Sequence, residues 1–329
     1  MKPILKKLLD NKARTIPILS FPSAKLLGVT VRELLSSPEK QAAGMKAIAA
    51  RCDVGAVLNM MDLSVEAEAF GAKVRFFEDD TPTVEAGILD DIADAGDISL
   101  PKVGAGRTGV YIEGIRKAKA LITDRPVFCG VIGPYSLAGR LFDMTELMME
   151  CFDSPEDVKT LVGRAADFIT EYILAYRAAG ANGVILAEPA AGLLSPSLAG
   201  EFSMPYVRRI IQAVQTDDFV VCYHNCGASV ADMAEDVASL GADIYHFGNA
   251  VDLDKLLPVL PQSGIVMGGV DPVLLRGGTA EEIRAAVKNV YRRYGDQPNF
   301  MLSTGCDVPA KTPWASLDVF FESVKALYE

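Results

Sequence analysis

Long hydrophobic runs are absent from this 329-residue sequence. No stretch approaches the roughly 20 consecutive apolar residues that a membrane-spanning helix requires. The segment 1–10 has lysines scattered through a short amphipathic helix, which is not the pattern of a secretory signal peptide. We therefore expect a cytoplasmic protein without a membrane partner.

The sequence also has fewer basic than acidic residues. Lysine and arginine together number 32 against 43 aspartates and glutamates, which gives a net charge of -11, and neither sign forms long blocks. Proteins that bind nucleic acid or anionic membranes need basic patches, so this balance argues against both classes. A small molecule or another protein is the expected partner.

Cysteine is sparse, with six in the whole sequence. A chain of this length without an export signal fits a reducing compartment better than a disulfide framework, and a thiolate metal site is compatible with that compartment. A lone cysteine is usually a small buried hydrophobic residue, and we expect this of Cys52, Cys129, Cys151 and Cys222.

The remaining two cysteines each follow a predicted strand. The stretch 220–227 is an apolar, β-branched run that leads into His224 and Cys226 and then a glycine. On an extended strand, residues i and i+2 point to the same face, so the imidazole and the sulfur can converge. The stretch 299–307 repeats this pattern and delivers Cys306. Together the three residues predict a zinc site with an open fourth position, as a catalytic zinc needs. Because the three are not sequence neighbours, spacing alone leaves the hydrophobic alternative open.

Strands and helices alternate along the chain. Eight stretches are predicted as main-body strands, each followed by helical sequence: 16–20, 55–62, 126–133, 183–187, 220–227, 242–246, 264–268 and 299–306. This predicts an α/β fold of the (β/α)8 TIM-barrel type, formed as a single domain over 1–329, with an N-terminal helical extension and a small hairpin excursion within 70–103. An open doubly wound sheet is the alternative.

The barrel is favoured because the polar candidates follow strand ends, and those ends converge on one mouth only in a closed barrel. The candidates are Asp62, Tyr135, Glu188, His224, Cys226, His246, Asn249, Asp271 and Cys306. The stretch 104–109 also matches the G-x-G-x-x-G dinucleotide fingerprint, but a polar segment broken by proline precedes it instead of a buried strand. We interpret it as a loop before a helix over 110–121.

The sequence motifs resemble those of a known family. His224-Asn225-Cys226-Gly227, together with 303–309 and Thr312-Pro313, resembles the zinc signature of corrinoid-dependent methyltransferases in the uroporphyrinogen decarboxylase superfamily, which include methylcobamide:coenzyme M methyltransferases and O-demethylase methyltransferases. Stretches 133–138, 188–206 and 268–272 also have counterparts in the superfamily, so the resemblance covers nearly the whole chain.

The resemblance implies zinc at His224, Cys226 and Cys306, and a corrinoid (cobalamin) carried by a separate partner protein. In the coenzyme M branch, zinc binds the acceptor thiol as a thiolate, which attacks the methyl group on cobalt. In the demethylase branch, zinc is a Lewis acid on a methyl ether, amine or alcohol, and Co(I) is the nucleophile. The direction of transfer stays open.

The other residues predicted at the mouth have two interpretations each. Glu188 either orients the substrate or caps the following helix. His246 is either a fourth zinc ligand or a hydrogen-bonded barrel histidine, and we favour the latter. Asp271 either supports a zinc ligand or forms an Asx turn. Tyr135 either lines the pocket or belongs to the core, and Asn249 is expected to contact substrate.

The chain departs from the decarboxylases of the superfamily in several places. The segment 21–25 lacks their arginine-rich substrate loop, and Arg140 falls where they carry a tyrosine. Only Asp62 matches one of their catalytic residues. A metal-free decarboxylase-type lyase is therefore the alternative function, and a scaffold that only binds a corrinoid protein is a third.

Overall fold

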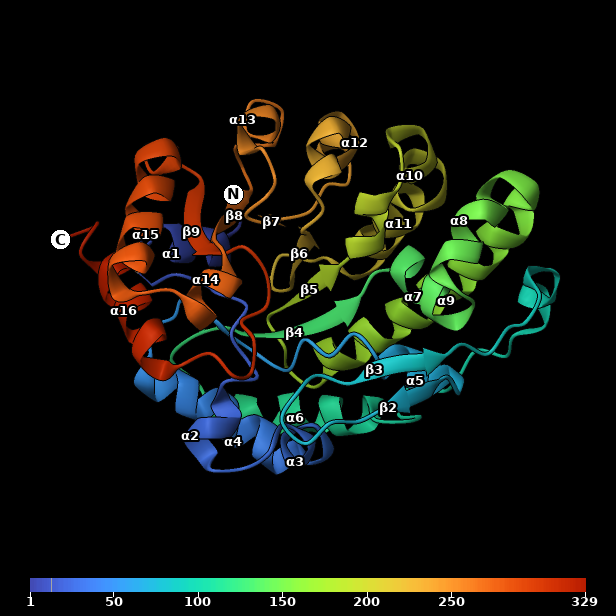
Figure 1. The fold of residues 1–329 in the computed structure, drawn as a ribbon, viewed down its shortest axis with the longest axis horizontal. Helices are drawn as coiled ribbons and strands as arrows, with labels where there is room; N and C mark the ends of the chain where they lie inside the picture. The colour runs from blue at the N-terminus through green and yellow to red at the C-terminus, as the bar shows by residue number, and fades with distance from the viewer. Residues whose placement is uncertain (13) are drawn as a thin grey trace.

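The computed structural model describes residues 1–12 and 14–329, and its centre is a curled parallel sheet of seven strands (Figure 1). The strand order is β1-β4-β5-β6-β7-β8-β9, with every neighbouring pair parallel. The strands are β1 (Val57–Leu58), β4 (Val127–Ile132), β5 (Gly183–Ala187), β6 (Val220–Asn225), β7 (Ile244–Phe247), β8 (Ile265–Val270) and β9 (Phe300–Thr304). Almost all their residues are buried, as in a parallel sheet covered on both faces.

Helices connect the strands and cover the outside of the curl (Figure 1). The α-helices are α1 (Pro3–Leu9), α2 (Ser23–Leu27), α3 (Val31–Ser36), α4 (Pro38–Arg51), α5 (Val65–Phe70), α6 (Thr108–Leu121), α7 (Pro134–Leu141), α8 (Met144–Asp153), α9 (Pro155–Ala178), α10 (Pro196–Phe202), α11 (Met204–Val214), α12 (Ala234–Ala238), α13 (Leu253–Leu256), α14 (Pro272–Gly277), α15 (Ala280–Tyr294) and α16 (Trp314–Lys325). Three 3-10 helices are interspersed: η1 (Ile92–Asp97), η2 (Pro189–Leu193) and η3 (Ala228–Met233). No helix in the described part of the chain is both long and apolar enough to span a bilayer.

The predicted hairpin excursion is confirmed. Strands β2 (Lys73–Arg75) and β3 (Thr83–Ala86) form a separate antiparallel pair, and most of their residues are exposed. Helix α15 begins with a capping box, since Thr279 and Glu282 exchange side-chain to backbone hydrogen bonds. Local sequence signals therefore determine these elements.

The prediction of an eighth strand at 16–20 is wrong. The segment is extended but is not part of the sheet, so the described residues do not form a complete eight-stranded barrel. It lies against β9 mainly through side chains: Ile18 N donates to Thr304 Oγ1 (3.1 Å), and Ser303 Oγ donates to the Ile16 carbonyl (2.8 Å). On its other side, Gly55 N donates to the Thr15 carbonyl (3.0 Å). Side-chain hydroxyls thus replace a strand ladder where the two ends of the sheet approach.

A buried cluster fills the inside of the curl. Alternate positions on every strand contribute to it, among them Leu58, Phe128, Ile185, Cys222, Ile244, Met267 and Met301. Leu5 and Leu8 of α1 join this cluster, so the N-terminal helix closes the interior with apolar side chains. A larger cluster, between the sheet and the surrounding helices, takes the other strand positions. The site described next lies where the strands end.

Candidate functional site

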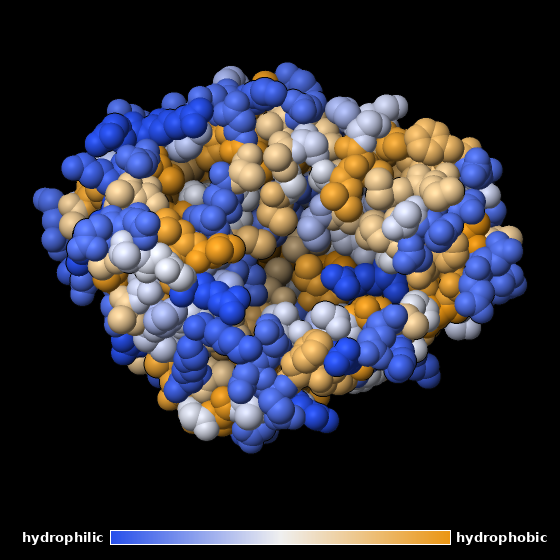
Figure 2. All heavy atoms as spheres, in the orientation of Figure 1, coloured by the Kyte–Doolittle hydropathy of each residue, from blue (hydrophilic) through white to orange (hydrophobic). Residues whose placement is uncertain are grey.

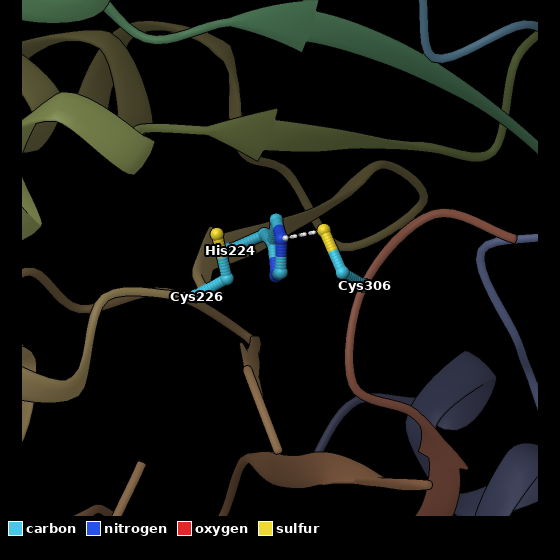
Figure 3. Close-up of side chains that lie close together, drawn as sticks. All are labelled: His224, Cys226 and Cys306. Carbon is cyan, nitrogen blue, oxygen red and sulfur yellow. Dashed lines mark hydrogen bonds between the residues drawn. The ribbon is translucent and has the colours of Figure 1, made fainter. Parts of the chain in front are cut away.

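His224, Cys226 and Cys306 converge at the carboxyl ends of β6 and β9 (Figure 3). One ligand atom from each lies within 4.8 Å of the other two, and Cys306 Sγ is 3.6 Å from His224 Nε2. The imidazole is buried, whereas both cysteines are partly exposed. The structure thus brings the predicted ligand set together; that this set binds a metal stays a prediction.

Two glycines allow the loops around this set to approach closely. A Cβ at Gly248, just after β7, would lie 2.7 Å from the Cys226 Cα. A Cβ at Gly305 would lie 2.5 Å from the Asn249 backbone nitrogen. Any larger residue at either position would push one cysteine-bearing loop away, so these glycines help to set the spacing of the two sulfurs.

A chain of hydrogen bonds supports the imidazole of His224 from behind. Its Nδ1 lies 3.1 Å from the His246 carbonyl oxygen and 2.8 Å from His246 Nδ1. His246 Nε2 is 3.1 Å from Ser303 Oγ, which in turn donates to the Ile16 carbonyl. One proton arrangement satisfies every contact: His224 Nδ1–H and His246 Nε2–H donate, and His224 Nε2 keeps its lone pair toward the sulfurs. This is the usual support of a metal-binding histidine.

His246 itself is fully buried, and hydrogen bonds engage both of its ring nitrogens. Burial and the neighbouring His224 lower its pKa, so the ring is neutral. Among the described residues it is not part of the convergent ligand group. The geometry is that of a hydrogen-bonded barrel histidine, and a role of His246 as a fourth metal ligand stays untested.

The two sulfurs differ in charge. A hydrogen bond from the Cys306 thiol lowers the pKa of Cys226 below its ordinary value. The pKa of Cys306 is raised, because it shares its proton with Cys226 and because it is buried. The pair therefore carries one thiolate at neutral pH, and a soft cation would release the second proton.

Glu188 is fully buried and caps α7. Its carboxylate accepts hydrogen bonds from Tyr135 N (2.9 Å), Ser136 N (2.7 Å) and the Ser136 hydroxyl. Burial raises the pKa of Glu188 to about 7, and the Ser136 hydrogen bonds oppose that shift. Glu188 follows β5, whereas α7 follows β4. The carboxylate therefore caps a helix that precedes it in the sequence, and not the following helix, as the capping interpretation had it. A role in orienting substrate stays a prediction.

The four other predicted residues lie in different surroundings. Asp62 is buried and accepts hydrogen bonds from Arg107, Tyr111 and Ser64. Tyr135 is buried with its hydroxyl 3.7 Å from Cys151 Sγ, as in the core interpretation. Asp271 caps α14 through Val273 N (2.8 Å), as in the Asx-turn interpretation. Asn249 is exposed and lies against Gly305, beside Cys306. Contact of any of these with substrate remains untested.

Sequence reasoning missed two buried ionisable residues, Arg107 and Glu66. Arg107 lies within the glycine-rich stretch 104–109 and forms ion pairs with Asp62 and with Glu68 (2.6 Å). Glu66 of α5 is buried, and burial raises its pKa to about 8. Neither stands out in the sequence, because Asp62 and Arg107 are 45 positions apart and Glu66 sits in an ordinary helix pattern.

A pocket of about 590 Å³ opens beside Cys226. Its walls include Ile132, Ser136 and Arg140 from β4 and α7, and Met144 and Leu193 from neighbouring elements. In the space-filling view this face is hollowed at its centre, with strongly hydrophilic and hydrophobic atoms side by side around the hollow (Figure 2). A ligand in this pocket can therefore reach one of the two cysteines.

Comparison with known proteins places this chain in a family. The family model for uroporphyrinogen decarboxylase (URO-D) matches residues 17–327. The chain belongs to the URO-D family. The resemblance inferred from the motifs is confirmed at this level.

The similar proteins include methyltransferases and decarboxylases. Methylcobamide:CoM methyltransferase MtbA of Methanosarcina mazei is 26% identical over 269 residues, covering 80% of this chain and 77% of the relative. Uroporphyrinogen decarboxylase of Chlorobium luteolum is 25% identical over 292 residues, covering 83% and 80%.

Solved structures agree on the fold. A methyltransferase from Methanosarcina mazei superposes with a TM-score of 0.86 over 100% of both chains, at 21% identity. A B12-independent methionine synthase from Shewanella sp. W3-18-1 gives 0.62 over 90% of this chain and 87% of its own, at 16% identity. The curled sheet with its helices is therefore a fold that this chain shares with both solved structures.

Proposed function

We propose that this protein is a zinc-dependent methyltransferase that moves a methyl group between a corrinoid on a partner protein and a small molecule. The convergence of His224, Cys226 and Cys306 is the single observation that carries the proposal. The MtbA relatives support methyl transfer of the corrinoid type, and the motifs in 224–227 and 303–309 resemble that branch of the superfamily.

The three residues fit zinc by their chemistry. Two sulfurs and one imidazole nitrogen are a common zinc donor set, and three protein ligands leave a fourth position for a reactant. In the proton arrangement described above, the Nε2 lone pair of His224 is free before any cation binds, and the hydrogen bond from Cys306 already lowers the pKa of Cys226. A zinc ion held there would supply Lewis acidity, which ionises a bound thiol or polarises the heteroatom of a methyl donor.

The protein's own residues would orient the reactants. The His246–Ser303 chain fixes the ring of His224 and so the direction of its lone pair. Gly248 and Gly305 set the spacing of the sulfurs, and the pocket beside Cys226 holds the small molecule. The corrinoid would come from outside on its own protein. That corrinoid would supply the methyl group to a thiol or accept it from a methyl donor held in the pocket.

The test is zinc content together with methyl transfer in matched cysteine variants. We expect one zinc per chain in the wild type and in Cys52→Ala, since Cys52 is a buried cysteine outside the ligand set. Cys306→Ala should lose most of the zinc and the methyl transfer while keeping the circular dichroism of the wild type. Elemental analysis and assays with methyl-Co(III) and Co(I) corrinoid measure both. Full zinc occupancy in Cys306→Ala would contradict the proposal.

A decarboxylase-type lyase is the second candidate, because uroporphyrinogen decarboxylases are also among the relatives. Its one matching catalytic residue, Asp62, is here bound to Arg107, Tyr111 and Ser64. Release of carbon dioxide from a porphyrinogen in the presence of a chelator would favour this candidate over methyl transfer.

A further inference from the structure

One arginine of the pocket has no partner among the residues that the structure describes. Arg140, near the end of α7, is partly buried and lines the same pocket as Cys226. Within residues 1–12 and 14–329, its guanidinium forms neither an ion pair nor a hydrogen bond. Arg107, the other arginine near Asp62, binds Asp62, Glu68, Ser64 and Tyr111. A guanidinium that is partly removed from water and left unpaired costs free energy, which a ligand can recover.

The nearby carboxyl groups are already engaged or neutral. Asp62 is saturated by Arg107 and its neighbours. Glu66 gives one oxygen to Ile132 N, its other oxygen has no partner among the described residues, and its pKa of about 8 keeps it protonated at neutral pH. Of the acidic residues lining the pocket, Asp143 caps α8 and Glu85 pairs with Lys73. None of these carboxyl groups is therefore a direct hydrogen-bonding partner of the Arg140 guanidinium.

Apolar side chains form much of the rest of the pocket wall. Ile132, Phe142, Met144 and Leu193 contribute to its walls. Cys226 lies on the wall as well, so the cavity connects the candidate metal centre with the guanidinium. A molecule that fills this space would have a soft or ether heteroatom at one end, a short apolar body, and a negative group at the other.

We propose that Arg140 binds the anionic group of the substrate, and that the substrate is a small organic acid, a carboxylate or a sulfonate, rather than a neutral molecule. The planar guanidinium presents paired donors that match such oxyanions in a bidentate way, which a neutral alcohol or amine cannot exploit. This inference rests on the proposed function for the reactive end of the substrate.

Calorimetric titration of purified, zinc-loaded protein tests the inference with matched probes. One pair is 2-mercaptoethanesulfonate against 2-mercaptoethanol, and the other is 4-methoxybenzoate against 4-methoxybenzyl alcohol. The wild type should bind at least one anionic probe about tenfold or more tightly than its neutral partner. Arg140→Met should weaken the anionic probe by roughly 10- to 100-fold and leave the neutral one unchanged, while Arg140→Lys retains part of the preference.

Arg276→Met is the control for net charge, since Arg276 is an exposed arginine of α14. This variant should keep the preference of the wild type for the anionic probe over its neutral partner. Equal affinities within both pairs, no binding of any probe to the wild type, or a loss shared by anionic and neutral probes in Arg140→Met would each contradict the inference. Anion binding that depends on Arg140 without any methyl transfer would contradict the proposed function alone. Methyl transfer to or from neutral substrates without anion preference would contradict this inference alone.

Discussion

The residues at the site come from two kinds of position: the ends of strands and the interior of helices. The ligand set was predictable because each ligand directly follows an apolar strand, where parallel strands deliver their functional side chains. Arg140 and Glu66 were not predicted, because both lie inside helices and their importance depends on which groups the fold brings near them. A sequence pattern carries no information about whether a particular arginine finds a partner.

Glu66 leads to a prediction about pH. Burial raises its pKa from 4.5 to about 8, so the native state holds a proton that the unfolded chain loses above about pH 4.5. The contribution of this group to stability is therefore fully present below pH 4.5 and is lost as the pH rises through 8. Glu66→Gln, which keeps the acceptor for Ile132 N, should remove this dependence.

Urea unfolding between pH 5 and 8 measures the difference. The free energy of unfolding of Glu66→Gln should gain on that of the wild type by up to about 1.4 kcal/mol per pH unit. Glu113→Gln, at a half-buried position of α6, is the control and should run parallel to the wild type. Parallel curves for Glu66→Gln as well would show that the carboxyl group is already ionised in the folded state.

At the scale of elements, the alternation of strands and helices was predicted well and the ends of the curl were not. Strand β5 occupies the predicted residues, and β6 covers most of its predicted stretch. The predicted strand at 55–62 shortens to Val57–Leu58. The segment 16–20 is apolar enough for a strand, but its neighbour β9 ends in Ser303 and Thr304, whose hydroxyls take the place of backbone partners. Strand propensity cannot reveal that side-chain hydroxyls replace the backbone hydrogen bonds of a strand pair.

Arg107, in the loop at 104–109, contacts the segment after β1, helix α5 and helix α6. This position gives a second prediction. Its side chain is 10% exposed and that of Asp62 is 1% exposed, so the pair is buried. Arg107→Met leaves the Asp62 charge without its partner and should cost about 3–5 kcal/mol of unfolding free energy.

Chemical denaturation measures this loss, with Arg116→Met on the exposed face of α6 expected to stay within about 0.5 kcal/mol of the wild type. Adding Asp62→Asn to Arg107→Met should recover part of the loss, because the unpaired charge is then gone. Equal effects of Arg107→Met and Arg116→Met would mean that the ion pair adds nothing to stability.

At the scale of the whole molecule, the two ends of the sheet meet through the segment 15–20, and this contact yields a third prediction. Thr304→Val keeps the shape of the side chain but removes the acceptor for the buried Ile18 N–H. The unpaired donor should cost about 1–3 kcal/mol. Thr83→Val, in the exposed hairpin strand β3, should change stability by no more than about 0.5 kcal/mol.

Hydrogen exchange locates the effect. The amides of 15–20 should exchange faster in Thr304→Val, while those of β5 and β6 keep their protection. Uniform loss of protection across the sheet would show that the contact between 15–20 and β9 is not a separable unit of stability.

The long sequence separation within the ligand set has a consequence for how the protein is made. His224 and Cys306 are 82 positions apart, and the chain that supports His224 ends at Ile16, 287 positions before Ser303. On a ribosome, which releases the N-terminal part first, a nascent chain can offer at most two of the three ligands until β9 has emerged. A metal ion therefore cannot guide the early steps of folding. Tight binding at these three residues would instead mark a chain whose last strand is already in place.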